Sequence, residues 1–273
     1  MIPAPAAEPG WRARARAWRY ALPDAVGYAI PGPGAAATAR AAQRLAAHGE
    51  SITIGWFTGR HDGPDEVVAA MRAIAPLLPA ASVLSLKAPH LRFRDDAIAT
   101  VAALGLPLVF DATTLDHADR TLALAEAAPP AGVVLPARWQ RSLADAERWR
   151  DRPVRLRLVK GEWPDPALPD VPAATAYLAL VDRLAGRTAP VGVATHDPAL
   201  AQAALARLVA AGTPCELEVL ASLPRRRVGA VAERLGVRTR VYLAFGPGWW
   251  PYALEQALRR PYLPRWWLAD RFG

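Results

Sequence analysis

Most of the short apolar runs in this sequence end on, or close to, a polar or charged residue. These residues bring together cationic, acidic, imidazole and phenol groups: Lys87, Asp111, Arg138, Lys160, His196 and Tyr242. They are spread through the chain, so only a fold that gathers the ends of the runs at one edge would place them side by side. At such an edge, this row is where the chemistry of the protein is expected.

The apolar runs number eight, and each is followed by a helix-like stretch. They are Ile52–Trp56, Ser82–Pro89, Leu106–Thr113, Gly132–Arg138, Val154–Gly161, Pro190–His196, Cys215–Ala221 and Thr239–Phe245. Strands that alternate with helices predict a parallel sheet. Eight such units in 273 residues match a single (β/α)8 barrel of the TIM type, an α/β fold whose active site lies at the C-terminal ends of its strands.

Two further segments flank the eight units. We expect residues 1–50 to form an N-terminal helical extension, with helices at Trp11–Tyr20 and Ala35–His48, and residues 51–273 to form the barrel domain. After the last strand, Tyr252–Arg260 is predicted to be a C-terminal helix over the barrel mouth, followed by a tryptophan-rich tail. The sequence has no separate linker or short-period repeat that would divide the chain further.

The composition argues against several classes of protein. No apolar run is long enough to span a bilayer, and Met1–Arg16 lacks the apolar core of a secretory signal. Cys215 is the only cysteine, so no internal disulfide can form, and a cytoplasmic location is the default expectation. The net charge of +8 comes mainly from arginines scattered over predicted helices, which favours a solvated basic surface over a nucleic-acid site.

Motifs for other kinds of site are missing from the sequence. The five histidines fall in different units, and none forms an HxxxH or HExxH pair, so no metal site is expected. There is no GxSxG elbow, Walker loop or GxGxxG fingerprint. The expected chemistry therefore rests on the residues at the ends of the predicted strands.

The segment Val154–Gly161, which carries Arg157 and Lys160 near its end, resembles the fifth strand of the proline dehydrogenase family, a family of flavin-dependent barrels. Six other segments resemble family strands in the right order: Leu84–Lys87 the second, Phe110–Ala112 the third, Val133–Ala137 the fourth, Ala194–Asp197 the sixth, Glu216–Leu220 the seventh, and Val241–Tyr252 the eighth strand with the loop after it. The resemblance covers roughly residues 50–262. Its strongest parts are Arg157–Gly161 and Thr195–His196.

The resemblance implies a bound FAD over the strand ends, with a hydride passing to flavin N5 from the carbon beside an amine. Arg157 matches the arginine beside N5, where it would stabilise developing negative charge. Lys87, Asp111 and Tyr242 match residues around the substrate, and Lys87 and Asp111 join Arg157 as the implied catalytic residues. Other positions that align with cofactor contacts of the family are Ala112, Lys160, Gly161, Thr195 and His196. Pro136, Glu162 and Arg259 also align with cofactor contacts, but the residue differs from the family pattern at each; Pro136 stands where the family has a glutamine.

Several of these positions also have a purely structural interpretation. Lys87 and Asp111 would then pair with each other across the mouth, and His196 would be a satisfied hydrogen-bonding residue, as lone histidines usually are. Arg157 and Lys160 are three residues apart, so strict strand alternation puts them on opposite faces. Both reach the site only if Lys160 lies past the end of its strand.

The sequence departs from the family pattern on the helix after the eighth strand. Adjacent arginines grip the substrate carboxylate there in the family, but Glu255 and Gln256 occupy those positions here. Arg259 replaces a family acidic residue, so the charge is inverted on one helical face, where Glu255 and Arg259 can pair. Glu162 and Glu218 add acids where the family has an alanine and a glutamine, and with Glu255 they predict an acidic substrate site that favours a cationic or uncharged substrate.

Two functions remain open from the sequence. The first is an FAD-dependent oxidoreductase of the proline dehydrogenase type, which oxidises a C–N bond of proline or, in preference, of a proline-like cyclic or secondary amine. Its small-molecule substrate would be free or held on a carrier protein, and an unknown acceptor would take the electrons. The second is a non-catalytic barrel of the same type that serves as a binding or assembly partner.

Overall fold

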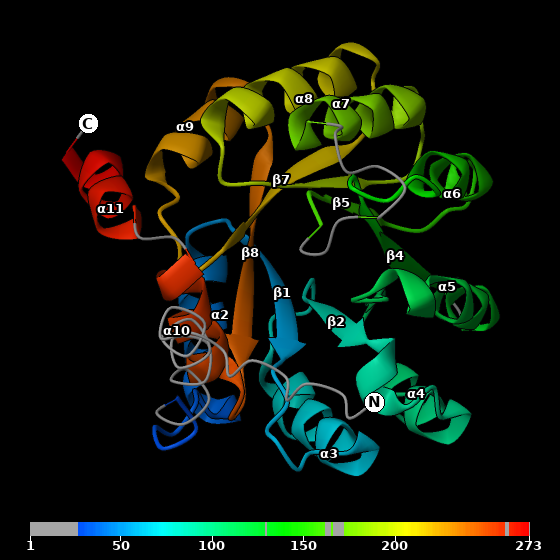
Figure 1. Cartoon of the computed structure of the whole chain (residues 1–273), viewed down its shortest axis with the longest axis vertical. Helices are drawn as coiled ribbons and strands as arrows, with labels where there is room; N and C mark the ends of the chain where they lie inside the picture. The colour runs from blue at the N-terminus through cyan, green and yellow to red at the C-terminus, as the bar shows by residue number, and fades with distance from the viewer. Residues whose placement is uncertain (1–26, 129, 162–164, 166–171, 260–261, 273) are drawn as a thin grey trace, which may run out of the picture.

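Eight parallel strands close into a barrel, and each strand pairs with its neighbours in sequence (Figure 1). The computed structural model describes residues 27–128, 130–161, 165, 172–259 and 262–272. The strands are β1 Ser51–Trp56, β2 Val83–Lys87, β3 Leu108–Asp111, β4 Ala131–Pro136, β5 Leu156–Val159, β6 Val191–Ala194, β7 Cys215–Leu220 and β8 Arg238–Phe245. Each predicted run overlaps one strand, and β1 pairs with β8 to close the ring. The predicted (β/α)8 barrel is confirmed.

Helices surround the strands on the outside of the barrel (Figure 1). They are α2 Ala35–Ala47, α3 Pro64–Ile74, α4 Asp95–Ala102, α5 Ala118–Ala127, α6 Ser142–Trp149, α7 Ala173–Leu184, α8 Pro198–Ala210, α9 Arg226–Arg234, α10 Trp249–Arg259 and α11 Leu263–Phe272, with short 3₁₀ turns at Ala75–Leu77, Ala88–Leu91 and Leu115–His117. Local chemistry explains where they begin. The Asp197 carboxylate, for example, accepts hydrogen bonds from the backbone N–H groups of Ala199 and Leu200, and so caps α8.

Side chains on each strand alternate between the surrounding helices and the barrel interior. The outward set is apolar and buried. Ile52 and Ile54 on β1, for example, belong to one large core with Leu156 and Leu158 on β5 and with residues of the helices. Burial of this outward set against the helices is what holds the closed barrel together.

The inward set combines glycines with large polar side chains. A Cβ atom at Gly55 would lie 1.8 Å from Tyr242 Oη, and one at Gly192 would lie 2.5 Å from Arg155 Nη2. The glycines of β1 and β6 therefore make room for side chains that cross the interior from β8 and β5. The side formed by β2, β3 and β4 carries a small apolar set instead: Val83, Val109 and Val134.

The N-terminal flank packs against the barrel. Ala39 and Ala42 of α2 join the main core. The predicted domain division after residue 50 stays a prediction, and the predicted helix Trp11–Tyr20 lies outside the described residues. None of the helices in the described part of the chain combines the length and apolar character that crossing a bilayer requires.

The C-terminal flank consists of two helices. The ring of Phe57, which follows β1, lies 5.9 Å from the ring of Trp249 and 4.9 Å from that of Tyr252, so α10 begins at the rim of the barrel. α11 was not predicted, because its segment reads only as a tail rich in tryptophan. It is anchored by Asp270, whose buried carboxylate accepts hydrogen bonds of 2.9 Å from the backbone N–H groups of the first two residues of α9.

Candidate active site

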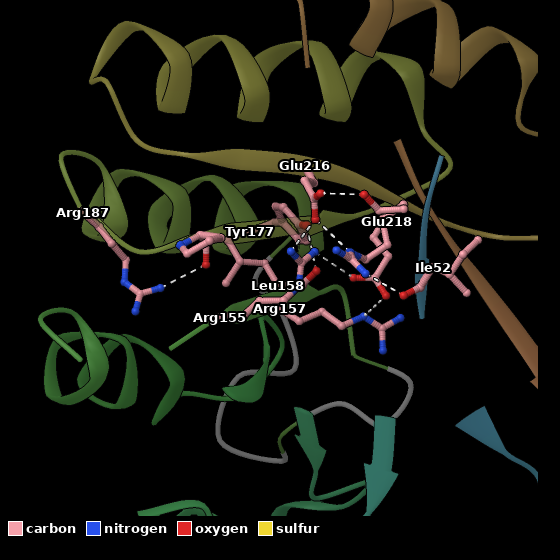
Figure 2. Close-up of polar contacts among 11 residues, drawn as sticks. Ile52, Arg155, Arg157, Leu158, Tyr177, Arg187, Glu216 and Glu218 are labelled. Atoms are coloured by element: carbon pink, nitrogen blue, oxygen red, sulfur yellow. Dashed lines mark hydrogen bonds and ion pairs between the residues drawn. The ribbon is translucent and has the colours of Figure 1, made fainter. Parts of the chain in front are cut away.

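An ion-pair network occupies the interior of the barrel between β5, β7 and β8 (Figure 2). The carboxylate of Glu216 accepts hydrogen bonds from Arg155 Nη1 at 2.5 Å, Arg240 Nε at 2.8 Å and Ser51 Oγ at 3.0 Å. Burial alone would raise the pKa of Glu216, but the charges of Arg155 and Arg240 outweigh that effect and lower the pKa to about 2. Glu216 is therefore an anion shared by two buried arginines.

Glu218 lies two residues further along β7 and joins this network to Arg157. Its Oε2 accepts a hydrogen bond from Arg155 Nη2 at 3.3 Å, and its Oε1 lies 3.2 Å from Arg157 Nε. Glu218 Oε1 and Arg157 Nε form an ion pair, yet neither atom has a hydrogen-bond partner of good geometry in the described part of the chain. The Arg157 guanidinium also lies 4.9 Å from the centre of the Tyr242 ring, which is a cation–π distance.

Arg157 is a buried cation directly below the mouth. Its side chain is 12% exposed, against 1% for Glu218. Burial acts to lower the pKa of Arg157, but the charge of Glu218, supported by Tyr242 and Asp111, reverses this effect and raises the pKa. The arginine implied to lie beside a flavin is thus charged and is held by an acid that is buried more deeply from solvent.

Lys87 and Asp111 lie side by side at the ends of β2 and β3, where they are paired in register. They form no ion pair with each other: Lys87 Nζ lies 4.1 Å from the centre of the Phe57 ring, while Asp111 Oδ1 accepts the backbone N–H of Thr113 at 2.9 Å. Among the described residues, the pairing that would explain them structurally is therefore not formed. Both side chains are half-buried at the rim of the barrel, where a substrate could contact them.

His90 was not predicted from the sequence, but it lies close to this pair. It follows β2, and its Nδ1 is 3.3 Å from Thr58 Oγ1. Burial, with a contribution from the Lys87 charge, lowers the pKa of His90 to about 4, so its ring is neutral at pH 7. The signal that could have found it is its position three residues after Lys87, just past a strand end.

Lys160 lies one residue beyond the end of β5, so strict strand alternation does not apply to it. Its ammonium is 3.7 Å from Asp197 Oδ2, and both side chains are more than 40% exposed. Gly161 follows with a φ of +90°, a conformation that favours glycine, and a Cβ there would lie 3.1 Å from Pro136 Cβ. The backbone therefore turns tightly over the end of β4.

Thr195 and His196 connect the end of β6 to the rest of the structure. Thr195 Oγ1 accepts the backbone N–H of Asp197 at 3.1 Å. His196 Nε2 accepts the backbone N–H of Leu220 at 2.9 Å, which leaves Nδ1–H to donate to the carbonyl of Pro224 at 2.9 Å. Both ring nitrogens of His196 are thus used in bracing β7 and the turn after it.

The remaining predicted site residues are spread around the mouth. Ala112 is buried near Trp139, and the carbonyl of Pro136 accepts Ser142 Oγ at 2.7 Å. On α10, Glu255 is half-buried and Gln256 is buried. Two predicted residues cannot be placed in this way: Glu162 and the side chain of Arg259 lie outside the described structure.

Arg187, between α7 and β6, is a buried residue that the sequence analysis did not single out. It is 3% exposed and lies away from the Arg157 cluster (Figure 2). Its guanidinium donates to the carbonyls of four residues: Arg150, Arg152, Val154 and Pro190. Burial lowers its pKa to about 10. These bonds fix the chain that enters β5, the strand that carries Arg157.

The described residues contain no cluster of side chains suited to a metal ion.

Solved structures with a similar barrel include proteins from two bacteria. With a TM-score of 0.70 and 15% identity, 97% of the chain matches 35% of proline utilization A (PutA) from Bdellovibrio bacteriovorus inactivated by N-propargylglycine. With a TM-score of 0.67 and 16% identity, 95% of the chain matches 33% of PutA from Corynebacterium freiburgense. The chain thus spans about a third of the length of each. No family model and no curated protein matches the sequence. The fold is a proline dehydrogenase-like barrel, as the resemblance implied.

Proposed function

We propose that this chain is an FAD-dependent oxidoreductase that removes a hydride from the carbon beside the nitrogen of a proline-like secondary amine. The observation that carries the proposal is the position of Arg157: a buried, charged guanidinium below the mouth of a proline dehydrogenase-like barrel, with Lys87 and Asp111 on the rim. That arrangement offers positive charge under a planar cofactor and polar groups around a substrate.

The described residues fit a flavin in charge and in backbone shape. Arg157 and Lys160 supply cations on and just past β5, and the turn at Gly161 keeps the backbone free of a side chain there. We assign the further contacts to the other positions that align with cofactor contacts of the family: Ala112, Pro136, Glu162, Thr195, His196 and Arg259. Because both nitrogens of His196 are bonded to the backbone, its contact would be made by the ring surface. When bound, FAD would accept the hydride.

The residues of the chain would bind and orient the amine. Asp111, which uses one carboxylate oxygen for the Thr113 N–H, has a second oxygen for the N–H of a secondary amine. Lys87 would bind an electron-rich substituent, and the ring of Phe57 holds its ammonium in place. The phenol of Tyr242, seated over Gly55, would form the floor beside Arg157. Re-oxidation would require an electron acceptor from outside the chain.

The substrate proposed is one without a free carboxylate at the family position. Glu255 stands where the resemblance expects an arginine, so the cation that would bind a carboxylate there is missing. Glu218 does not add to this effect, because two arginines already neutralise its charge. A decarboxylated, esterified or carrier-tethered ring suits this end of the site better than free proline.

A non-catalytic barrel is the second candidate function. It is favoured by the same two positions, Glu255 and Gln256, since loss of the arginine pair also fits a protein released from substrate binding. A binding or assembly partner of this kind would have no need for flavin.

Uptake of flavin separates the two functions. After incubation with FAD and gel filtration, we expect the wild-type protein to keep flavin absorbance near one equivalent per chain. Gly161→Ala should weaken FAD binding by about tenfold or more, because an alanine strains the φ of +90° that turns the backbone past Pro136. Gly105→Ala is the matched control, because Gly105 has a similar φ of +77° at the end of α4. A folded wild-type protein that stays colourless would favour the non-catalytic function.

A further inference from the structure

The buried contact between Glu218 and Arg157 has a consequence for the charge of the proposed cofactor site. We propose that Glu218 is a positioning residue that fixes the Arg157 guanidinium and sets how much positive charge Arg157 presents to a bound flavin. The inference rests on the proposed function. It concerns a position where the family resemblance has a neutral glutamine.

Glu218 is the acid available to Arg157 in the interior network. Glu216 is already shared by Arg155 and Arg240, at 2.5 Å and 2.8 Å. The nearest carboxylate oxygen of Glu218 to Arg157 lies at 3.2 Å, and the other lies 3.3 Å from Arg155. Three interior arginines thus face two glutamates, so removal of the Glu218 charge would leave the cluster with an excess of two cations.

The geometry holds Arg157 on two sides. The Tyr242 ring lies 4.9 Å from the guanidinium carbon, and Glu218 lies against Nε. Because Arg157 Nε and Glu218 Oε1 are 3.2 Å apart without a directed hydrogen bond, charge attraction carries this contact. A glutamine at 218 would have nearly the same shape but would lose that attraction, so it tests charge separately from packing.

A counter-ion in contact with Arg157 would also tune the flavin. Reduction adds negative charge to the isoalloxazine, and positive charge nearby stabilises the reduced form. Glu218, whose side chain is 1% exposed, cancels part of the Arg157 charge where water screens little of it. The wild-type barrel should therefore hold a flavin that is harder to reduce than the same barrel without the Glu218 charge.

The experiment compares the flavin midpoint potential of the wild type, Glu218→Gln and Glu216→Gln. We expect Glu218→Gln to favour reduced flavin by about tenfold, a positive shift of about 30 mV for a two-electron couple. Glu216→Gln is the matched control on the same strand, since Glu216 contacts Arg155 and Arg240 but has no ion pair with Arg157 among the described residues. A Glu218→Gln shift no larger than the control shift overturns the proposal.

A double-mutant comparison tests whether Glu218 acts through Arg157. Arg157→Met with Glu218→Gln replaces the buried pair by neutral residues of similar volume, which proteins often tolerate. We compare the midpoint potential of the double variant with that of Arg157→Met alone. This difference should be less than about half of the difference between Glu218→Gln and the wild type. An undiminished shift would show that Glu218 acts without Arg157, and would also overturn the proposal.

A measurement on the flavin-free protein keeps this inference separate from the proposed function. Arginine Nε–H signals report how rigidly a guanidinium is held, and the Arg157 signal is identified by its loss in Arg157→Lys. We expect a slowly exchanging signal in the wild type and in Glu216→Gln, but faster exchange in Glu218→Gln. If no flavin binds and this pattern appears, the proposed function fails while the positioning role stands. Equal exchange in all three proteins contradicts the positioning role.

Discussion

Replacing Glu216 with glutamine should lower the free energy of unfolding by about 3–5 kcal/mol at neutral pH, the cost of breaking a buried ion pair from one side. Glu216 is 7% exposed, and its carboxylate bonds to Arg155, Arg240 and Ser51. The variant would leave two buried arginines with too little negative charge. Urea unfolding of the two proteins measures the difference.

The free energy of unfolding lost in Glu216→Gln should become smaller as the pH falls. The folded pKa of Glu216, about 2, lies below its ordinary value of 4.5, so its contribution is present above pH 4.5 and disappears as the pH falls towards 2. The full contribution is about 3 kcal/mol, of which about 2 kcal/mol should be gone at pH 3. The stability gap between wild type and variant should therefore narrow in acid.

Glu126→Gln provides the control for this experiment. Glu126 also pairs with two arginines, Arg148 and Arg152 at 2.7 Å and 2.9 Å, but those arginines are 52% and 41% exposed. A surface pair of this kind should cost about 1 kcal/mol or less. If Glu216→Gln costs no more than Glu126→Gln, the interior network does not stabilise the barrel in the way described.

Reversing the charge on α10 should change which amine the protein oxidises. The double variant Glu255→Arg with Gln256→Arg restores the arginine pair that the resemblance expects, and it should raise kcat/KM for free proline by about tenfold or more. Turnover of a ring without a carboxylate should rise less, because such a ring offers no group for the new cations. The readout is the rate with each amine, measured on flavin-loaded protein.

Two companion variants make this prediction interpretable. Gln256 is 8% exposed, so an arginine at this position must reach out of a buried site. The single variant Glu255→Arg is therefore made as well, because it leaves the buried position unchanged. Glu233→Arg on α9 carries the same charge reversal on an exposed outer helix. A folded, flavin-loaded double variant that gains no more proline turnover than Glu233→Arg would contradict the inverted-helix explanation.

The strands were predictable because their outward faces are nearly all apolar. Ile52 and Ile54, or Leu156 and Leu158, must be buried under helices, and glycines such as Gly186, Gly212 and Gly236 mark where those helices end. Along most of the chain, the spacing of apolar residues predicts the same helices and strands that the barrel contains, so the local pattern and the global fold are consistent.

The interior network could not be predicted in the same way, although a signal for it was present. Arg155, just before β5, and Arg157 lie two apart, as do Glu216 and Glu218 on β7, and this spacing puts each pair on one face of extended chain. The sequence does not say that Arg155 and Glu218 meet over Gly192, because that requires the shear of the closed barrel. Glu218 therefore looked like an acid facing the substrate.

The partners of His196 and the end of the chain escaped prediction for a related reason. His196 bonds to the backbone of Leu220 and Pro224, and no side-chain pattern reports a backbone partner. α11 is fixed by Asp270 at the start of α9, a contact between segments 43 or more residues apart. Both depend on tertiary structure that local propensity does not encode.

Anaerobic mixing of the flavin-loaded protein with amines tests the central claim most directly. The proposed function predicts that pyrrolidine or a proline ester bleaches the flavin absorbance, and that free proline does so more slowly. Flavin that stays oxidised with every cyclic and secondary amine, in protein that dithionite still reduces, would contradict the assignment of this barrel as an amine oxidoreductase.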